Sequence, residues 1–350
     1  MTAYVTLVPL AAGLHLRWPR YNAAVIETLL RRERPGLVAL EPLPPGFASD
    51  PTWQDHEELL LPWIAVPWAR RSGVPVVGVH EPSPDPRAAS DLERYLEAYP
   101  DGRHALDEAR AVERPLHELL AAALTLPRVL DEVVSVLEAA RALRLDAFGD
   151  GPATDWIEAR SEAAAARVAA AGCEHTLVLV GLDRYAPLRD ALQRAGLQVV
   201  VPAEPEPDDA ARERALLDLA WRGEGADPGA LVARLRQLGH AEALYHAAGL
   251  LLAHAHPAEA LDTLEGALRL EFAEPWFLPG SLLARLGQLR DLAGRRDDAV
   301  KAYRGVLALD WAPREARAVA RAGLAAPFEP AAGASEPDAP ARDGPAAETT

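Results

Sequence analysis

The chain has 350 residues, enough for two domains that each bury a core of their own. Hydrophobic residues make up 49% and charged residues 25% of the chain, proportions that are ordinary for a globular protein. The formal net charge of −16 argues against sequence-independent binding to nucleic acid or anionic lipid, because both require clustered positive charge. We therefore expect neither nucleic acid nor a membrane among its partners.

The apolar N-terminus, MTAYVTLVPLAAG, is interpreted as a first strand and not as a signal sequence. It lacks a leading basic region, and its apolar stretch runs directly into Arg17 and Arg20. No apolar run approaches the ~20 residues that a membrane-spanning helix needs. Cys173 is the only cysteine, so no intramolecular disulfide can form, which fits a reducing compartment. We predict a cytoplasmic protein.

The first part of the chain alternates short apolar runs with helical patterns, which indicates βαβ units and a parallel sheet. The run TLVLV is hydrophobic on both faces, as expected for a central parallel strand. Residues 88–145 show only helical patterns and predict a helical insertion. The expected strands are 4–10, 37–40, 74–79, 176–180 and 198–201, the other expected helices are 22–34, 59–71, 155–171 and 188–195, and irregular segments are expected at 81–87 and around Gly149 and Gly151.

Composition divides the chain into four parts. Residues 1–203 are expected to form the α/β domain, with a short, mostly parallel sheet. The acidic, Pro-rich segment 204–209 is a natural linker. Residues 210–328 have helical patterns throughout and predict an all-α domain. The tail 329–350 is rich in Ala, Pro, Glu and Asp, and we expect it to be disordered.

The segment LARLGQLRDLAGRRDDAVKAYRGVLALD, residues 283–310, predicts a helical hairpin broken at Gly294. Leu286 and Gly287 lie on one helix face, and Ala299 and Tyr303 lie on the facing side of the next helix. This pattern resembles the tetratricopeptide (TPR) repeat, in which a small residue lets two helix backbones approach. The resemblance implies binding of a partner polypeptide.

A first repeat is predicted at 244–270, where Ala260 occupies the small position that Ala299 occupies in the second. The insertion EPWFLPG lengthens the spacing between the two repeats. Two repeats are fewer than the three that usually make such a stack stable. We therefore expect the helices within 210–238 to cap the array or to form a degenerate third pair.

Polar residues follow the expected strands, and ligands of open α/β sheets collect at the carboxyl ends of strands. An acid, an imidazole and a guanidinium that converge there would suit hydrolysis of a small molecule, with Glu or His activating water and Arg stabilising an oxyanion. The alternative is that these residues are structural, since turns are polar in any sheet. For Glu41 the functional interpretation is favoured over the structural one, because a carboxylate directly after an apolar strand is costly to bury without a partner. The candidates are His15, Glu41, His80, Glu81, Asp183 and Arg184.

Over roughly residues 4–202 the chain resembles the TraB/TIKI and erythromycin-esterase/ChaN-like superfamily. The segments concerned are GLHLRWPRYNAAVIETLLRRERPGLVALEPLP, GVPVVGVHEP and VGLDRYAPLRDALQRAG. The resemblance implies that His15, Glu41, Glu81 and Arg160 are site residues. Two departures stand out: Arg184, preceded by Asp183, replaces the late histidine, and the third strand ends in His80 and Glu81 in place of a single Asp.

Three hypotheses of function remain open at this point. The leading one is an interaction protein that binds a polypeptide through its TPR-like helices. The second is an esterase or peptidase in which His15 and Glu41 activate water and Arg160 or Arg184 stabilises anionic intermediates. The third, a haem or metal carrier, follows from other members of the superfamily it resembles. The sequence has no Walker loop, G-x-G-x-x-G or G-x-S-x-G motif, assigns no metal ligands and leaves the cofactor unknown.

Overall fold

In the computed structural model, the described residues are 3–82, 87–149, 156–271 and 275–330. They form two compact units, Met1–Ala215 and Leu216–Thr350, and each is described by itself. The division falls inside helix α9 (Asp209–Trp221), which begins at the last residue of the predicted linker 204–209. Residues 204–208 have no regular structure. Parts of the predicted irregular segments, and the tail from residue 331, lie outside the described residues.

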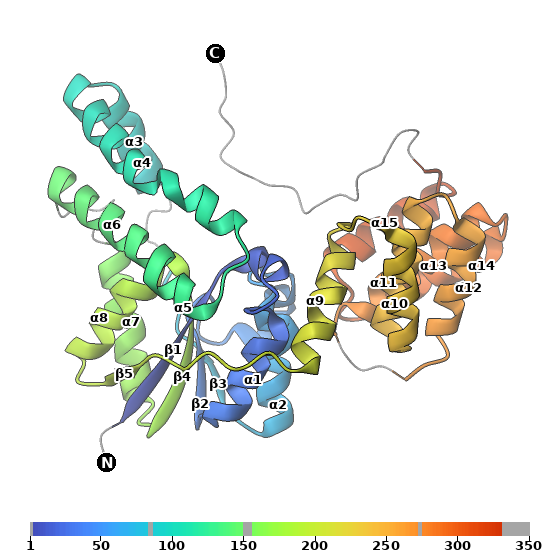
Figure 1. Ribbon diagram of the computed structural model, residues 1–350, viewed down its shortest axis with the longest axis horizontal. Helices are drawn as coiled ribbons and strands as arrows, with labels where there is room; N and C mark the ends of the chain where they lie inside the picture. Colours follow the sequence, from blue (N-terminus) through green and yellow to red (C-terminus); the bar gives the residue numbers. More distant parts are fainter. Residues whose placement is uncertain (1–2, 83–86, 150–155, 272–274, 331–350) are drawn as a thin grey trace. The chain divides into compact units, whose positions relative to one another are not determined.

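The first unit contains a five-stranded parallel sheet in the order β3-β2-β4-β1-β5 (Figure 1). The predicted strands are confirmed, with the third shortened at both ends. Strand β4 lies between β2 and β1 and is buried along its whole length, as its two-sided apolar run predicted. The strands are β1 (Tyr4–Leu10), β2 (Leu37–Leu40), β3 (Val76–Gly78), β4 (His175–Gly181) and β5 (Gln198–Val200).

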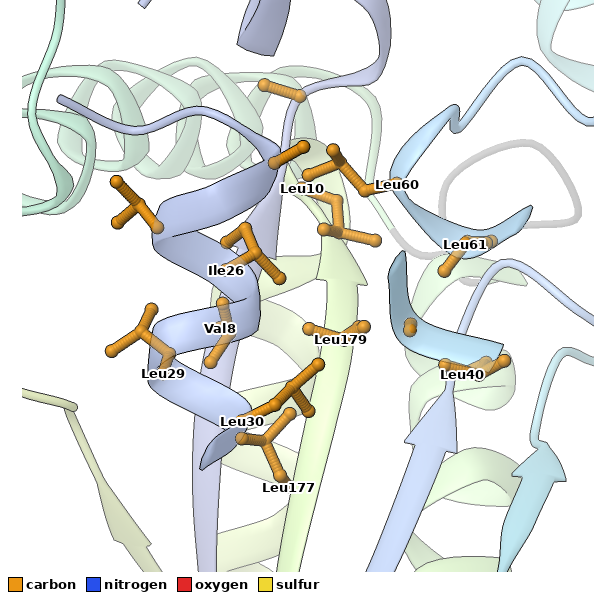
Figure 2. Close-up of a cluster of buried hydrophobic side chains, with 14 of the residues drawn as sticks. Val8, Leu10, Ile26, Leu29, Leu30, Leu40, Leu60, Leu61, Leu177 and Leu179 are labelled. Atoms are coloured by element: carbon orange, nitrogen blue, oxygen red, sulfur yellow. The ribbon is translucent and has the colours of Figure 1, made fainter. Parts of the chain in front are cut away.

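Helices cover both faces of the sheet. Alternate residues of β4 point to opposite sides, so Leu177 and Leu179 join one core while Val178 and Val180 join the other. The first core lies under α1 (Ala23–Glu33) and α2 (Val66–Ser72), and Figure 2 shows Ile26, Leu29 and Leu30 of α1 over the strands. The second lies under α7 (Trp156–Ala170) and α8 (Tyr185–Arg194). Each fully buried leucine stabilises the fold by about 1.5–3 kcal/mol.

The predicted helical insertion is present between β3 and α7. Its long helices α4 and α6 pack against each other, and Leu126, Val129 and Val133 belong to the first core. The insertion is thereby fixed against the loops that leave the sheet. Its helices are α3 (Ala88–Glu97), α4 (Pro100–Ala121), α5 (Leu126–Arg128), the π-helix η5 (Val129–Val134) and α6 (Ser135–Phe148).

The second unit is entirely helical in its described residues. Helices that follow one another along the chain also pack together. None of the helices described in either unit combines the length and the apolar character needed to cross a bilayer. The helices are α10 (Pro228–Leu238), α11 (Ala241–Ala253), α12 (Pro257–Ala267), α13 (Leu278–Leu292), α14 (Arg296–Ala308) and α15 (Arg314–Ala325).

The predicted hairpin at 283–310 is formed by α13 and α14. The two helices are antiparallel, because Gly287 lies against Tyr303 while Leu283, one turn earlier, lies against Gly305. Tyr303 is fully buried, and its ring also touches Gly323 of α15, a contact that the sequence pattern did not predict. Two glycines on different helices thus make room for one aromatic ring.

The hydroxyl group of Tyr303 is satisfied inside this packing. It donates to Asp291 at 2.9 Å, and the same carboxylate accepts from Arg296 at 3.0 Å and from the backbone amide of Phe328 at 2.9 Å. The Asp291 side chain is completely buried. It therefore ties α14 and the segment after α15 to α13.

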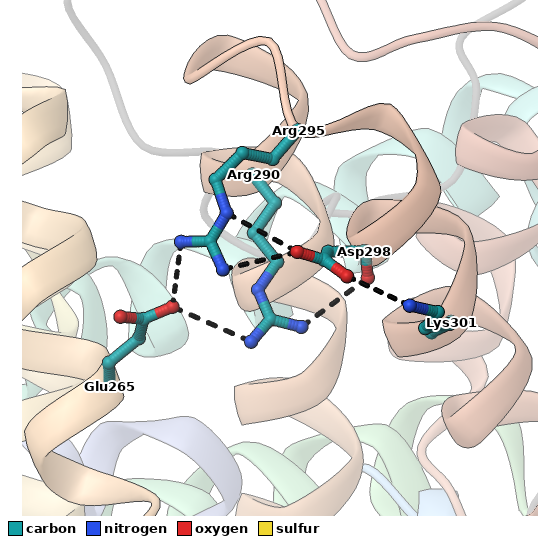
Figure 3. A network of polar contacts seen from close by, with 5 residues as sticks. All are labelled: Glu265, Arg290, Arg295, Asp298 and Lys301. Atoms are coloured by element: carbon teal, nitrogen blue, oxygen red, sulfur yellow. Dashed lines mark hydrogen bonds and ion pairs between the residues drawn. The ribbon is translucent and has the colours of Figure 1, made fainter.

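A second polar network joins α12, α13 and α14 (Figure 3). Glu265 accepts from Arg295 at 3.1 Å and from Arg290 at 3.5 Å. Asp298 accepts from Arg295 at 3.2 Å and from Lys301 at 3.0 Å. Exposed ion pairs contribute about 0–1 kcal/mol each, and the pairs of this network are exposed or partly exposed, so the apolar packing decides how these helices are arranged.

We predict that Gly287→Ala destabilises the second unit by about 1–3 kcal/mol, as overpacking does. A methyl group at this position would lie 2.3 Å from Cε1 of Tyr303, which has no room to move. The control is Gly249→Ala in α11, where an added Cβ has no neighbour within 4 Å. That change should stabilise by about 0.5–1 kcal/mol. Urea unfolding followed by circular dichroism measures both, and equal stabilisation would contradict the packing described.

Candidate functional site

A cavity of about 350 Å³ opens at the carboxyl edge of the sheet, between the ends of β1 and β4. After β1 the chain turns through η1 (Ala12–Arg17) towards α1, while after β4 it turns through η6 (Leu182–Arg184) towards α8 on the opposite face. Neighbouring strands whose loops diverge in this way leave a crevice, which is the usual ligand position in open α/β sheets. The structure therefore has a cavity at the edge of the sheet where the sequence predicted a ligand site.

Glu41, directly after β2, is the centre of a buried polar cluster. Its carboxylate accepts a hydrogen bond from Nε of Arg184 at 2.7 Å, and its other oxygen lies 3.8 Å from Nδ1 of His80. The backbone amide of Glu41 is held by Leu179 of β4 at 2.9 Å. The ends of β2 and β4, far apart in the sequence, thus place an acid and a guanidinium in contact.

The surroundings of Glu41 keep it ionised. Burial by itself would raise its pKa, but the contact with His80 and the positive charge of Arg184 outweigh burial, and the pKa is lowered. For Arg184 burial likewise opposes charge, while Glu41 and Asp183 overcome it and raise the pKa. Asp183 lies 3.4 Å from Nη1 of Arg184. The guanidinium is therefore positioned by two carboxylates.

Arg160 reaches the same cluster from α7. Its terminal nitrogen Nη2 lies 2.8 Å from Nδ1 and 2.9 Å from Nε2 of His80. Burial and the neighbouring Arg184 lower the pKa of Arg160. A guanidinium carries only donors, so the imidazole nitrogen that it meets acts as an acceptor. The ring of His80 is 24% exposed and can reach solvent.

Glu81 lies beside this cluster and pairs with a different arginine. Its carboxylate is bonded to Arg167 of α7, which lowers its pKa, and Arg167 also donates to the carbonyl of Val79 at 3.1 Å. The structure thus brings together five of the candidates, Glu41, His80, Arg160, Asp183 and Arg184, and gives Glu81 a separate partner.

His15 is buried in the loop after β1, and both of its ring nitrogens are engaged. Nε2 accepts from the amide of Ala11 at 3.0 Å, and Nδ1 donates to the carbonyl of Tyr21 at 2.6 Å. Burial lowers its pKa to about 4, although the Tyr21 carbonyl favours the charged form. The imidazole is therefore neutral and holds the loop between β1 and α1 in shape. We do not retain His15 as the residue that activates water.

Glu58, which the sequence analysis did not single out, lies in the wall of the cavity. It is only 5% exposed, and neither carboxyl oxygen accepts a hydrogen bond from a side chain within the described parts of the chain. Burial raises its pKa to about 8, and the nearby backbone of Ala12 only partly offsets that rise. The available signal was a carboxylate that directly precedes the apolar run LLLPWIAVPW.

The described residues contain no group of three or more His, Cys, Asp and Glu side chains that could hold a metal ion. A haem or metal carrier therefore stays a prediction from resemblance. Comparison of the chain with known protein families, with curated proteins and with solved structures finds no match. The chemistry of the site has to be inferred from its geometry.

We predict that Glu58→Gln makes the protein more stable than the wild type at alkaline pH. The folded state raises the pKa of Glu58 from 4.5 to about 8, so between these values the folded protein binds the extra proton and wild-type stability falls as pH rises. The advantage of Glu58→Gln should grow between pH 5 and pH 8 by on the order of a few kcal/mol.

The measurement is urea unfolding at several pH values, with Glu57→Gln as control. Glu57 is the exposed neighbour, so its substitution makes the same chemical change without removing a buried carboxyl group. Its stability curve should run parallel to that of the wild type. If the curve of Glu58→Gln is also parallel, Glu58 is not held in its protonated form.

Proposed function

We propose that the first unit is a hydrolase of small esters or amides. One observation carries the proposal: Glu41, a buried carboxylate, contacts both an imidazole and a guanidinium, and the guanidinium of Arg184 lines the cavity. Hydrolysis requires a base for water and a cation for the developing oxyanion. The cluster supplies one of each, held by the same carboxylate.

His80 is the proposed general base. Its partly exposed ring can accept a proton from water when water takes the place of Arg160 at the accepting nitrogen, and Glu41 orients the ring and stabilises the imidazolium that forms. Arg184 is the proposed oxyanion stabiliser, because its guanidinium is fixed by Glu41 and Asp183 before any substrate arrives. Arg160, next to the ring of His80, limits the orientations that the ring can adopt.

We predict that His80→Asn lowers kcat/KM about 10²–10⁴-fold, the usual contribution of a general base. The assay is a panel of p-nitrophenyl esters and anilides of short acyl chains, read by colour release with the full-length protein. The matched control is His104→Asn in α4, where the side chain is 77% exposed, and it should keep wild-type turnover. Thermal unfolding of both variants tests that each remains folded.

Two results would remove the proposal. One is an intact wild-type protein that turns over no member of the panel. The other is a folded His80→Asn variant with the activity of His104→Asn. Arg184→Lys adds a further check, since it keeps the charge but loses the planar fork that meets Glu41. Its loss should appear mainly in kcat if Arg184 acts on the transition state.

Binding of a polypeptide by the second unit is the second proposal. It is supported by the order of the helices, which pack as consecutive neighbours, and by the contact of Gly287 with Tyr303 that the repeat pattern predicted. A peptide array probed with the full-length protein tests it. We expect a common sequence feature among the bound peptides, and an array without specific binding would exclude this role.

A further inference from the structure

The cavity between β1 and β4 combines an apolar body with an acidic wall. The acidic residues Glu57, Glu58 and Asp183 line it, together with Arg184, whose guanidinium is the one cation among the lining residues. This guanidinium is already paired with Glu41 and Asp183. The remaining wall is mostly apolar and includes Leu14, Leu116, Leu120, Val133 and Leu137.

Glu58 is the group in this wall that lacks a charged partner. Both of its oxygens are buried, and no side chain of the residues the structure describes donates a hydrogen bond to them. A buried carboxyl group is unfavourable unless it is neutral or meets an opposite charge. Its own segment offers no cation. Nδ1 of His56 accepts a hydrogen bond from the Glu58 amide, so this nitrogen carries no proton, and Glu57 adds a like charge.

The other groups that face Glu58 do not neutralise it either. Arg184 and Asp183, after β4, act on it with opposite signs, and the hydroxyl of Tyr21 is engaged with the carbonyl of Pro9. The backbone of Ala12 gives a limited hydrogen-bond contribution. A ligand that brings a positive charge would therefore supply the opposite charge that the buried carboxyl group of Glu58 lacks.

We infer that the cavity binds small organic cations, in which an ammonium group pairs with Glu58 and a short aliphatic or aromatic body lies against the leucines of α4 and α6. If the first unit is the hydrolase proposed above, on which this step rests, its substrates are esters or amides that bear an amine. The ammonium group is placed against the acidic wall, and Arg184, which borders the same cavity, faces the reacting carbonyl group.

Pairing with an ammonium ion requires Glu58 to lose its proton. Binding is then accompanied by release of about one proton below pH 8, and affinity rises ~10-fold per pH unit between pH 6 and pH 7. An alkylamine stays charged over this range because its pKa lies near that of lysine, about 10.4. The change with pH thus reports on the protein and not on the probe.

The test is isothermal titration of the full-length protein with n-hexylamine, 1-hexanol and hexanoate, which share one apolar chain. We expect n-hexylamine to bind at least tenfold more tightly than the other two, with the stated pH dependence and with proton release in buffers of different ionisation enthalpy. Equal affinities for the three compounds, or tighter binding of hexanoate, would overturn the inference.

Two variants assign the effect to Glu58. Glu58→Gln should lose at least tenfold in affinity for n-hexylamine and should lose the pH dependence, while Glu118→Gln, at an exposed position of α4 that does not line the cavity, should keep both within about threefold. If both variants behave alike, the cation is not held by Glu58. Binding of n-hexylamine without turnover of any ester would reject the hydrolase and leave the cation site standing. Turnover with no preference for amine-bearing esters would reject the cation site and leave the hydrolase standing.

Discussion

The pairing of Glu41 with Arg184 determines how the carboxyl edge of the sheet is arranged. A carboxylate that follows a fully buried strand has to be neutralised, and the cation comes from the loop after β4, the neighbouring strand. The same contact fixes the side chain that borders the cavity and places His80 next to a negative charge. Removal of either partner would leave a buried charge, so the shape of the cavity and the chemistry of its edge depend on one ion pair.

The sequence predicted the parts of this arrangement that follow from pattern. The two-sided apolar run of β4 identified the central strand, and the rule that polar loops meet at one edge of a parallel sheet brought Glu41, His80 and Arg184 together in advance. What it could not supply was the partner of each group. His15 is occupied by two backbone groups, whereas Glu58 has no side-chain partner within the described residues, and a sequence does not contain either fact.

The two units obtain specificity by different means. In the first unit, alternate residues of each strand divide between two cores, so the apolar pattern requires a layer of helices on each face. In the second, the contact of Tyr303 with Gly287 was predicted because the residues lie in one local hairpin, while the contact with Gly323 depends on a third helix. Local packing was accessible to pattern analysis, and packing between helices distant in sequence was not.

The central position of β4 also bears on how the sheet assembles. Strands β1 and β2 do not pair with each other but with opposite sides of β4, which follows them by more than a hundred residues. Until that late segment arrives, their backbone groups have no ladder to join, and their apolar faces have no complete core. Such distant pairing gives a high contact order, which slows folding and prolongs the time during which unpaired, aggregation-prone strand edges are exposed. We therefore expect the sheet to fold only after β4 has been synthesised, with chaperones protecting the earlier strands on the ribosome until then.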